Sequence, residues 1–306
     1  MRVLVTGATG FVGRHVSRIL QERDDVVLHE TSLSSGVDLR ESDSTDALFA
    51  ELKPQKVINC AAYVGGIHFG LQHEADLFRN NLLISLNLLH AAATHNVERL
   101  LNPIANCAYP AHLSYFKEEE FWDGPLHDSV LVYGFVRKGF WVGSHAYRRQ
   151  HGLDVINLVV SNMFGPGDHM DAERCHALGG MILRVLKAQK TGARELVVWG
   201  TGTPVREWLY VGDGAEALVR GLSAPAADDP VNVGVGKGIS IGDLARRIAE
   251  IAEFDGDIVF DTDRPDGAAH KTMDGTRGRE LLGWQPDTPF DDALRKTVDW
   301  FREQVR

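Results

Sequence analysis

The chain has 306 residues, of which 44% are hydrophobic and 24% charged, as expected for a globular protein with a sizeable core. A formal net charge of -10 argues against a nucleic-acid partner, which would require a basic surface. No apolar run approaches the roughly 20 residues that cross a bilayer, so no membrane partner is expected. The length allows one large α/β domain, or a large domain with a smaller lobe.

The first residues already predict a strand, so no signal peptide is expected. Cys60, Cys107 and Cys175 are far apart and form no CxxC pair, which disfavours a disulfide framework or a zinc site. We therefore expect a protein of the reducing cytoplasm that holds no metal.

The first hundred residues alternate short β-branched runs with amphipathic stretches, a pattern that predicts a parallel sheet with helices on both faces. The predicted strands are Val3–Val5, Val26–Leu28, Val57–Cys60 and Leu100–Leu101, and the predicted helices are Phe11–Glu22, Ser44–Leu52 and Leu77–His95.

The later part of the chain predicts fewer strands and a looser pattern after residue 165. The predicted elements are a helix over Tyr133–His151 closed by Gly152, a strand over Asp154–Val160, and helices over Met181–Gln189, Ile241–Phe254 (with Ser240 as N-cap) and Phe290–Gln304.

These elements predict a Rossmann-type doubly wound parallel sheet followed by a smaller mixed α/β C-terminal substrate lobe. Residues 1–165 are expected to form the dinucleotide-binding domain, with a return segment near 207–235. Residues 166–206 and 236–306 are expected to form the substrate lobe. The crevice between the two is the expected ligand site.

Three glycines follow the first predicted strand at the point where the first helix begins. The GxxGxxG spacing lets the backbone turn tightly and approach a pyrophosphate, whose charge then lies at a helix N-terminus. We expect NAD or NADP to contact this loop through Gly7, Thr9, Gly10, Phe11, Val12 and Gly13.

An acidic residue follows the second predicted strand. Glu30 occupies the position where a carboxylate commonly binds the ribose hydroxyls of NAD, and its neighbours His29 and Thr31 supply no arginine for a 2′-phosphate. The sequence therefore favours NAD over NADP. Asp38 has two interpretations, since its carboxylate could contact the adenine amine or cap the following helix.

The helix predicted over Tyr133–His151 carries an arginine one turn after its first residue. At roughly 100° per residue, Arg137 lies beneath Tyr133, whereas Lys138 points off that face. A tyrosine of intrinsic pKa about 10 needs nearby positive charge to act near neutrality. Arginine supplies the charge and hydrogen-bond donors but, unlike lysine, cannot relay a proton.

Several segments resemble the extended short-chain dehydrogenase/reductases and, within them, the GDP-L-fucose synthase family. The segments that carry the resemblance are Ala61–Ile67, Cys107–Pro110, Ser161–Pro166, Val198–Glu207 and Arg264–Gly267. The match extends over nearly the whole chain. It implies 3,5-epimerisation of a GDP-4-keto-6-deoxyhexose through enediolate intermediates, followed by reduction of the C4 ketone with NADPH.

The resemblance implies a Cys–His pair for epimerisation, because the proton leaves one face of the sugar and returns on the other. Cys107, in the segment Asn106–Pro110, and His176, in the segment Glu173–His176, match the family positions. Each residue alone has a structural alternative, since a lone cysteine is usually a small hydrophobic residue.

The same resemblance places a serine and a lysine of the reduction step at positions that are Ala105 and Arg137 here. A methyl group cannot hydrogen-bond the C4 oxygen, and losing one such donor typically costs about 10² to 10³ in rate. We therefore expect C4 reduction to be weakened or absent, while Tyr133 and Arg137 still bind the cofactor.

Phosphate and guanine contacts are implied for the C-terminal lobe, where the arginine fork suits phosphate oxygens. The expected substrate contacts are Asn162, His176, Arg184, Trp199, Arg206 and Lys271, and the further expected cofactor contacts are Ala61, Ala62 and Asn81.

Three functions remain open from the sequence. The first is an epimerase of GDP-4-keto-(6-deoxy)hexoses with little C4 reduction, and the second is a full NAD(P)H-dependent 3,5-epimerase/4-reductase that makes GDP-L-fucose. The third is a non-catalytic nucleotide-sugar-binding paralogue. The resemblance also implies a homodimer that packs Leu82–Leu89 and the Tyr133 helix into a four-helix bundle.

Overall fold

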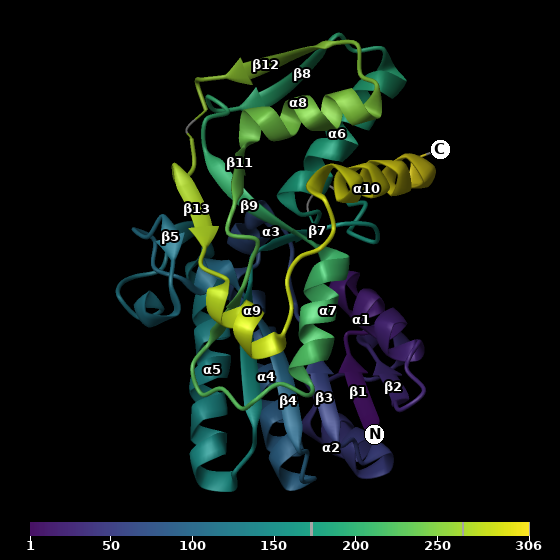
Figure 1. The fold of residues 1–306 in the computed structure, drawn as a ribbon, viewed down its shortest axis with the longest axis vertical. Coiled ribbons are helices and arrows are strands. Elements are labelled where there is room, and N and C mark those ends of the chain that lie inside the picture. The colour runs from purple at the N-terminus through teal and green to yellow at the C-terminus, as the bar shows by residue number, and fades with distance from the viewer. Residues whose placement is uncertain (172–173, 265, 306) are drawn as a thin grey trace.

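The computed structural model describes residues 1–171, 174–264 and 266–305 of the chain. Glu173 and Pro265, which belong to the motifs above, lie outside the described residues. A sheet with flanking helices occupies the lower half of Figure 1, and a smaller group of helices and strands lies above it.

Six parallel strands form the main sheet, in the order β10-β6-β4-β3-β1-β2. They are β1 (Arg2–Thr6), β2 (Val27–Thr31), β3 (Lys56–Asn59), β4 (Arg99–Ala105), β6 (Val155–Val160) and β10 (Val231–Val233). The chain leaves β1 for one side of the sheet and returns to pair β3 on the other. Ligands bind at such a switch point, at the carboxyl ends of the strands. The predicted doubly wound α/β fold is confirmed.

Helices cover both faces of this sheet because successive strand side chains point to opposite sides. Val3 and Val5 pack into a core with α1 (Phe11–Gln21) and α7 (Val211–Gly221). Leu4 packs into a second core on the opposite face. That face is covered by α2 (Ser42–Leu52), α4 (Glu74–Thr94) and α5 (Leu131–His151). Each fully buried aliphatic side chain contributes about 1.5 to 3 kcal/mol.

A buried row of polar side chains crosses the middle of the sheet. Thr6 Oγ1 donates to Asn59 Oδ1 at 2.8 Å, and Asn59 Nδ2 donates to Asn102 Oδ1 at 3.0 Å. Asn102 Nδ2 then donates to Asn157 Oδ1 at 3.0 Å. Buried amides without partners are costly, so this row favours one register for β1, β3, β4 and β6.

The upper group in Figure 1 packs three helices against a two-stranded parallel sheet. Its elements are α6 (Ala177–Thr191), α8 (Ile241–Ala252), α10 (Phe290–Gln304), β8 (Glu195–Trp199) and β12 (Asp257–Asp261). The hydroxyl of Ser240 accepts a hydrogen bond from the Asp243 amide at 3.0 Å, so Ser240 is the N-cap that the sequence predicts.

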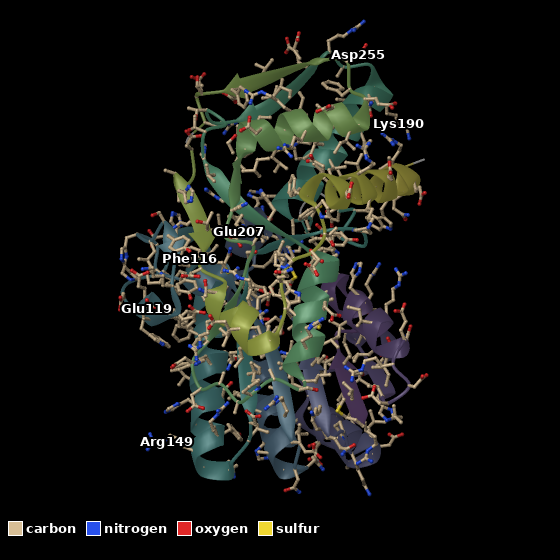
Figure 2. All side chains as sticks on the ribbon, in the orientation of Figure 1. Phe116, Glu119, Arg149, Lys190, Glu207 and Asp255 are labelled. Carbon is tan, nitrogen blue, oxygen red and sulfur yellow. The ribbon has the colours of Figure 1, made fainter. Side chains whose placement is uncertain are left out.

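A third sheet lies where the two groups meet. Its strands are β5 (Tyr115–Phe116), β7 (Asn162–Phe164), β9 (Val205–Tyr210), β11 (Gly238–Ser240) and β13 (His270–Met273). Glu207, labelled near the centre of Figure 2, is buried there and accepts hydrogen bonds from the amides of Val235 at 2.6 Å and Met273 at 2.8 Å. This carboxylate therefore joins β9 to the end of β13 and to the segment that follows β10.

The sequence did not predict three helices: α3 (Ile67–Gln72), α7 and α9 (Thr276–Leu282). Two of them are short, and α7 contains glycines that lower its helical propensity. Leu282 and Trp284 belong to the range expected for the substrate lobe, but they pack into the core beneath α1 and α7. Short 3₁₀ turns occupy Leu33–Ser35, Asn106–Ala108, Glu118–Glu120 and Asp128–Val130.

Candidate active site

The glycine loop between β1 and α1 is tightly wound. Gly7 has φ +65°, and a Cβ there would lie 2.5 Å from the carbonyl oxygen of Cys60. A Cβ on Gly13 would collide with the carbonyl of Gly7. Gly10, the N-cap of α1, has no side chain to cover the first amides of the helix. A pyrophosphate can therefore approach the backbone at the positive end of α1, and the loop fits a dinucleotide.

The segment after β2 carries the groups expected to bind the adenosine. Glu30 is exposed near the end of β2, beside Val5 of β1. Asp38 forms an ion pair with Arg40 at 2.6 Å, and hydrogen bonds from Arg40 lower the pKa of this carboxyl. The alternative in which Asp38 caps the next helix is wrong, because Glu41 is the N-cap of α2.

Two serine hydroxyls that were not predicted from the sequence lie beside Thr9, a predicted residue of the glycine loop. Thr9 Oγ1 and Ser34 Oγ are 2.9 Å apart, and Ser32 joins the same cluster through its Oγ, 3.0 Å from that of Ser34. Ser32 also accepts from the Ser35 amide in a reciprocal cap of the short 3₁₀ turn. The S/T-x-x-S spacing was the only local signal for this arrangement.

The side chain of Asn81 is hydrogen-bonded to the main chain of the segment that follows β3. Its Nδ2 donates to the Tyr63 carbonyl at 2.8 Å, and its Oδ1 accepts from the Tyr63 amide at 3.1 Å. The amide of Ala61 donates to Asn59 Oδ1 at 3.1 Å. The conformation of the segment that contains Ala61 and Ala62 is thus fixed by two asparagines, one on α4 and one on β3.

Tyr133 and Arg137 are joined by a direct hydrogen bond. Arg137 Nη2 donates to the Tyr133 hydroxyl at 2.8 Å, and the guanidinium carbon lies 4.7 Å from the centre of the ring. Burial raises the pKa of Tyr133, and the charge of Arg137 opposes that rise. Lys138 points off this face, as the helical spacing predicts: its ammonium binds the Phe121 carbonyl and lies over the rings of Phe121 and Trp122.

One nitrogen of Arg137 is left available. Arg137 is 7% exposed, and its Nε has no hydrogen-bond partner among the described residues. A buried donor of this kind is costly unless a ligand accepts from it. Together with the glycine loop, this orphan donor fits a bound NAD(P), whose ribose hydroxyls are acceptors.

Cys107 lies in the 3₁₀ turn Asn106–Ala108, directly after β4. A Cβ on Gly134 would lie 2.8 Å from the Cys107 carbonyl oxygen, so the first turn of α5 packs closely on this turn. Burial raises the pKa of the Cys107 thiol to about 12, opposed by the positive charge of Arg137. The thiol therefore keeps its proton at neutral pH. Ala105, the last residue of β4, presents only a methyl group.

His176 is the N-cap residue of α6 and comes from the other part of the molecule. Its Nδ1 lies 2.8 Å from Oδ1 of Asp168, and its ring lies 5.6 Å from that of Phe11 in α1. Burial lowers the pKa of His176, but the hydrogen bond and charge of Asp168 outweigh it, so the pKa is raised. The sequence analysis missed Asp168, although the Gly-Pro-Gly-Asp segment gave a turn signal.

Two contacts tie the His176 segment to the cofactor helix. His15 Nε2 lies 2.8 Å from the Pro166 carbonyl oxygen, and a Cβ on Gly167 would lie 2.9 Å from the Arg14 side chain. Arg14 in turn donates to the carbonyl of Thr9 at 2.8 Å. The structure therefore brings the segment that carries His176 next to the glycine loop.

The residues expected to bind the substrate nucleotide differ in whether their polar atoms are already hydrogen-bonded within the protein. Lys271 donates to the carbonyls of Ala111, at 2.7 Å, and Leu113. Asn162 Nδ2 donates to the Glu207 carbonyl at 2.9 Å. Both polar groups are thus held by the main chain.

Arg206, Arg184 and Trp199 keep more of their binding capacity. Arg206 stands beside Lys271 across the β9–β13 pair and donates from Nη1 to the Val205 carbonyl at 2.8 Å. Arg184 has a longer contact, 3.3 Å from Nη1 to the Val197 carbonyl. Burial lowers the pKa of both arginines. Trp199 is 65% exposed, with the Arg264 guanidinium 5.1 Å from its ring centre.

Other features of the described chain lie outside this site. Two surface cavities of about 480 and 470 Å³ are lined by other residues, between α7 and α9 and around Trp122. Within the described ranges, no group of three or more His, Cys, Asp or Glu side chains is placed to hold a metal ion. Across the same ranges, no helix combines the length and apolar character that a membrane crossing requires.

Residues 3–234 match the model of the NAD dependent epimerase/dehydratase family. The chain belongs to this family. It is 35% identical to the putative GDP-L-fucose synthase 2 of Arabidopsis thaliana, over 99% of this chain and 92% of the relative. It is 34% identical to GDP-L-fucose synthase 1 of the same plant, over 99% of this chain and 94% of the relative.

The fold is also similar to that of a solved structure of a GDP-L-fucose synthetase. The crystal structure of a GDP-L-fucose synthetase from Naegleria fowleri bound to NADP superposes with a TM-score of 0.91 at 29% identity, covering 99% of this chain and 93% of that one. The protein is therefore an enzyme of an NAD(P)-dependent family with GDP-L-fucose synthases among its homologues, as the motif resemblance predicts.

Proposed function

We propose that the protein epimerises C3 and C5 of a GDP-4-keto-6-deoxyhexose and reduces C4 slowly or not at all. The observation that carries the proposal is the pair of proton-transfer groups. Cys107 follows β4, and His176 is hydrogen-bonded to Asp168 at the start of α6. The relatives named GDP-L-fucose synthases, at 34% and 35% identity, support the substrate class.

Epimerisation begins with removal of a proton next to the C4 ketone, whose oxygen takes up the electron pair as an enediolate. A proton then returns to the same carbon from the opposite face. At neutral pH the Cys107 thiol holds its proton, with a pKa of about 12 caused by burial, so it suits the group that returns a proton. The imidazole of His176 suits the group that removes one.

The part of the site expected to act in C4 reduction, which we call the hydride side, offers few hydrogen-bond donors to the C4 oxygen. Bound NAD(P)H would supply a hydride to C4. Tyr133 offers its hydroxyl to the C4 oxygen, and Arg137 supports it with a hydrogen bond of 2.8 Å. Ala105 offers no second donor, and such a loss typically costs about 10² to 10³ in rate. Arginine also cannot pass a proton onward to the phenol.

A full 3,5-epimerase/4-reductase is the second candidate. The direct Arg137–Tyr133 hydrogen bond favours it, because a cation bound to the phenol lowers the cost of forming a phenolate. The names of the relatives favour it as well, since they are called synthases. The two candidates differ only in the rate of hydride transfer.

We propose NAD rather than NADP as the preferred cofactor. Glu30 is exposed near the end of β2, where a carboxylate suits free ribose hydroxyls and repels a 2′-phosphate. Arg40, a nearby cation, is paired with Asp38. The N. fowleri relative holds NADP, so a comparison of NADH and NADPH binding by fluorescence titration tests the preference directly. Tighter NADPH binding would contradict it.

We assign the nucleotide of the substrate to the segments 166–206 and 236–306. Arg206 is the leading phosphate contact, because its position beside Lys271 puts two cations together, and Arg184 is a second contact. The exposed Trp199 suits a wall for the base. Lys271 and Asn162 act mainly by holding main-chain segments in place, since their polar atoms are already bonded.

We propose a homodimer built from α4 and α5. Leu88 and Leu89, within the expected contact stretch, are core residues, whereas Leu86 is 56% exposed. Phe78 and Phe135 are also exposed, and their rings stack 6.2 Å apart across the two helices. This apolar stripe suits a four-helix bundle with a second copy.

The three dispersed cysteines, all free, support the expected cytoplasmic location.

Deuterium incorporation separates the candidate functions. The protein is incubated with GDP-4-keto-6-deoxymannose in D₂O, with and without NADH or NADPH. Deuterium at C3 and C5 without nicotinamide oxidation is the expected result. Rapid oxidation would instead support the full synthase, and no exchange under either condition would leave only a nucleotide-sugar-binding protein.

A thiol variant and a matched control complete the test. Cys107→Ser removes the proposed acid and should abolish exchange at one or both carbons. Cys60→Ser changes another partly buried, free cysteine, which lies outside the 3₁₀ turn, and it should leave exchange unchanged. Undiminished exchange in Cys107→Ser would show that the thiol does not take part.

A further inference from the structure

We propose that Asp168 is a positioning residue that fixes the tautomer and orientation of the His176 imidazole for proton transfer. The inference rests on the proposed function of His176. It adds to the site a buried carboxylate that contacts Nδ1 of the imidazole.

The carboxylate of Asp168 is held on several sides. Asp168 is 4% exposed, and its Oδ1 accepts from the His169 amide at 2.7 Å. Its Oδ2 accepts from the His176 amide at 3.3 Å, and a Cβ on Gly179 of α6 would lie 2.9 Å from that oxygen. The carboxylate therefore has little room to turn, and its 2.8 Å contact with His176 Nδ1 is imposed by the fold.

The contact determines which nitrogen of His176 carries the proton. An ionised carboxylate only accepts hydrogen bonds, so Nδ1 must be the protonated nitrogen of the neutral ring. Nε2 is then left with its lone pair for the substrate carbon acid, or with a proton when the ring is charged. The Phe11 ring, 5.6 Å from the imidazole, limits its movement on the side of the cofactor helix.

Other charged and titratable groups surround this pair. From the same segment these are His169, Asp171, Arg174 and Cys175. From α1 they are Arg14, whose charge acts on His169, and His15, which contacts the Pro166 carbonyl oxygen. Asp168 is the group that touches the ring nitrogen, and its hydrogen bond and charge outweigh burial in setting the direction of the His176 pKa. Removing the charge of Asp168 should therefore lower the pKa of His176.

A purely structural role is the alternative, because Asp168 also binds two main-chain amides. Asp168→Asn distinguishes the two roles. An asparagine has one amide oxygen, which at the Oδ2 position keeps accepting from the His176 amide. Its NH₂ group then replaces Oδ1, which accepts from the His169 amide and contacts Nδ1. The charge is lost, however, and an NH₂ group placed against Nδ1 would stabilise the other tautomer, which leaves Nε2 protonated.

Histidine NMR and exchange kinetics on the full chain give the test. The ring nitrogens of ¹⁵N-histidine-labelled protein are titrated between about pH 5 and 8, and the His176 signals are assigned by their loss in His176→Gln. We expect Asp168→Asn to lower the pKa of His176 and to change its tautomer. Deuterium exchange should fall by about 10²-fold. The limb of the pH–rate profile that belongs to His176 should move to lower pH.

Asp213→Asn is the matched control, since Asp213 also accepts from a main-chain amide and a hydroxyl, those of Thr288, but lies on α7 outside the site. It should leave the His176 titration and the pH–rate profile unchanged. An unaltered titration or profile in Asp168→Asn would overturn the inference. Wild-type protein that shows no exchange at all would overturn the proposed function, while the titration alone would still report whether Asp168 sets the tautomer.

Discussion

The hydride side and the proton side of the site are assembled in different ways. Tyr133 and Arg137 are neighbours on one helical turn, joined by a hydrogen bond of 2.8 Å. Cys107 and His176 come from the end of β4 and the start of α6, in separate parts of the fold. Under the proposed function, Ala105 and Arg137 affect mainly hydride transfer, whereas proton transfer needs groups from two segments that are far apart in the chain.

The largest expected effect is a loss of proton transfer with cofactor binding retained. His176→Gln removes the titrating imidazole but keeps a polar side chain, and solvent exchange at C3 and C5 should fall by about 10² to 10⁴-fold. NADH binding, measured by fluorescence titration, should be retained because the glycine loop is untouched. A variant that exchanges at the wild-type rate would remove His176 from the mechanism.

The next effect restores the hydride side. Ala105→Ser combined with Arg137→Lys supplies the hydroxyl donor and the amine that the resemblance associates with reduction. Oxidation of NAD(P)H by the keto sugar should rise by up to about 10² to 10³-fold, while exchange stays at its wild-type rate. The single variants serve as controls for additivity. No rise in oxidation, or a wild-type rate that is already high, would contradict the proposed weakness of C4 reduction.

A third substitution tests how much the buried polar row of the main sheet contributes to stability. Asn102→Leu interrupts the buried amide row and leaves Asn59 Nδ2 without its acceptor and Asn157 Oδ1 without its donor. Each unsatisfied group costs about 1 to 3 kcal/mol, so the free energy of unfolding in urea should fall by that order. Asn232→Leu, which removes a buried asparagine outside the row, provides a comparison. Unchanged stability in Asn102→Leu would show that the row relaxes without cost.

The smallest effect on catalysis is expected on the outer face of α4. Leu86→Glu places a charge on the exposed apolar stripe and should convert a dimer to a monomer in light scattering after size exclusion. Exchange and oxidation rates should change little, since Leu86 lies outside the site. Arg149→Glu, a charge change elsewhere on α5, should keep the dimer. A wild-type protein that is already monomeric would refute the four-helix interface.

Much of the fold followed from sequence pattern, because it depends on short-range periodicity. The last helix was predicted with its observed bounds, Phe290–Gln304, and the Ser240 cap was also predicted. The short helix α3 and the glycine-containing α7 were not, since their packing outweighs a weak local preference. A parallel, doubly wound sheet was predicted, but the order of its six strands was not.

Sequence alone determined the glycine loop, the Tyr133–Arg137 spacing and the family, since each depends on residues close together in the chain or on motifs that can be matched one by one. The tertiary structure decided which side chains are already bonded. It paired Asp38 with Arg40, fixed Lys271 to main-chain carbonyls and placed Asp168 against Nδ1 of His176. These partners depend on where loops meet after folding, and no local periodicity encodes that distance.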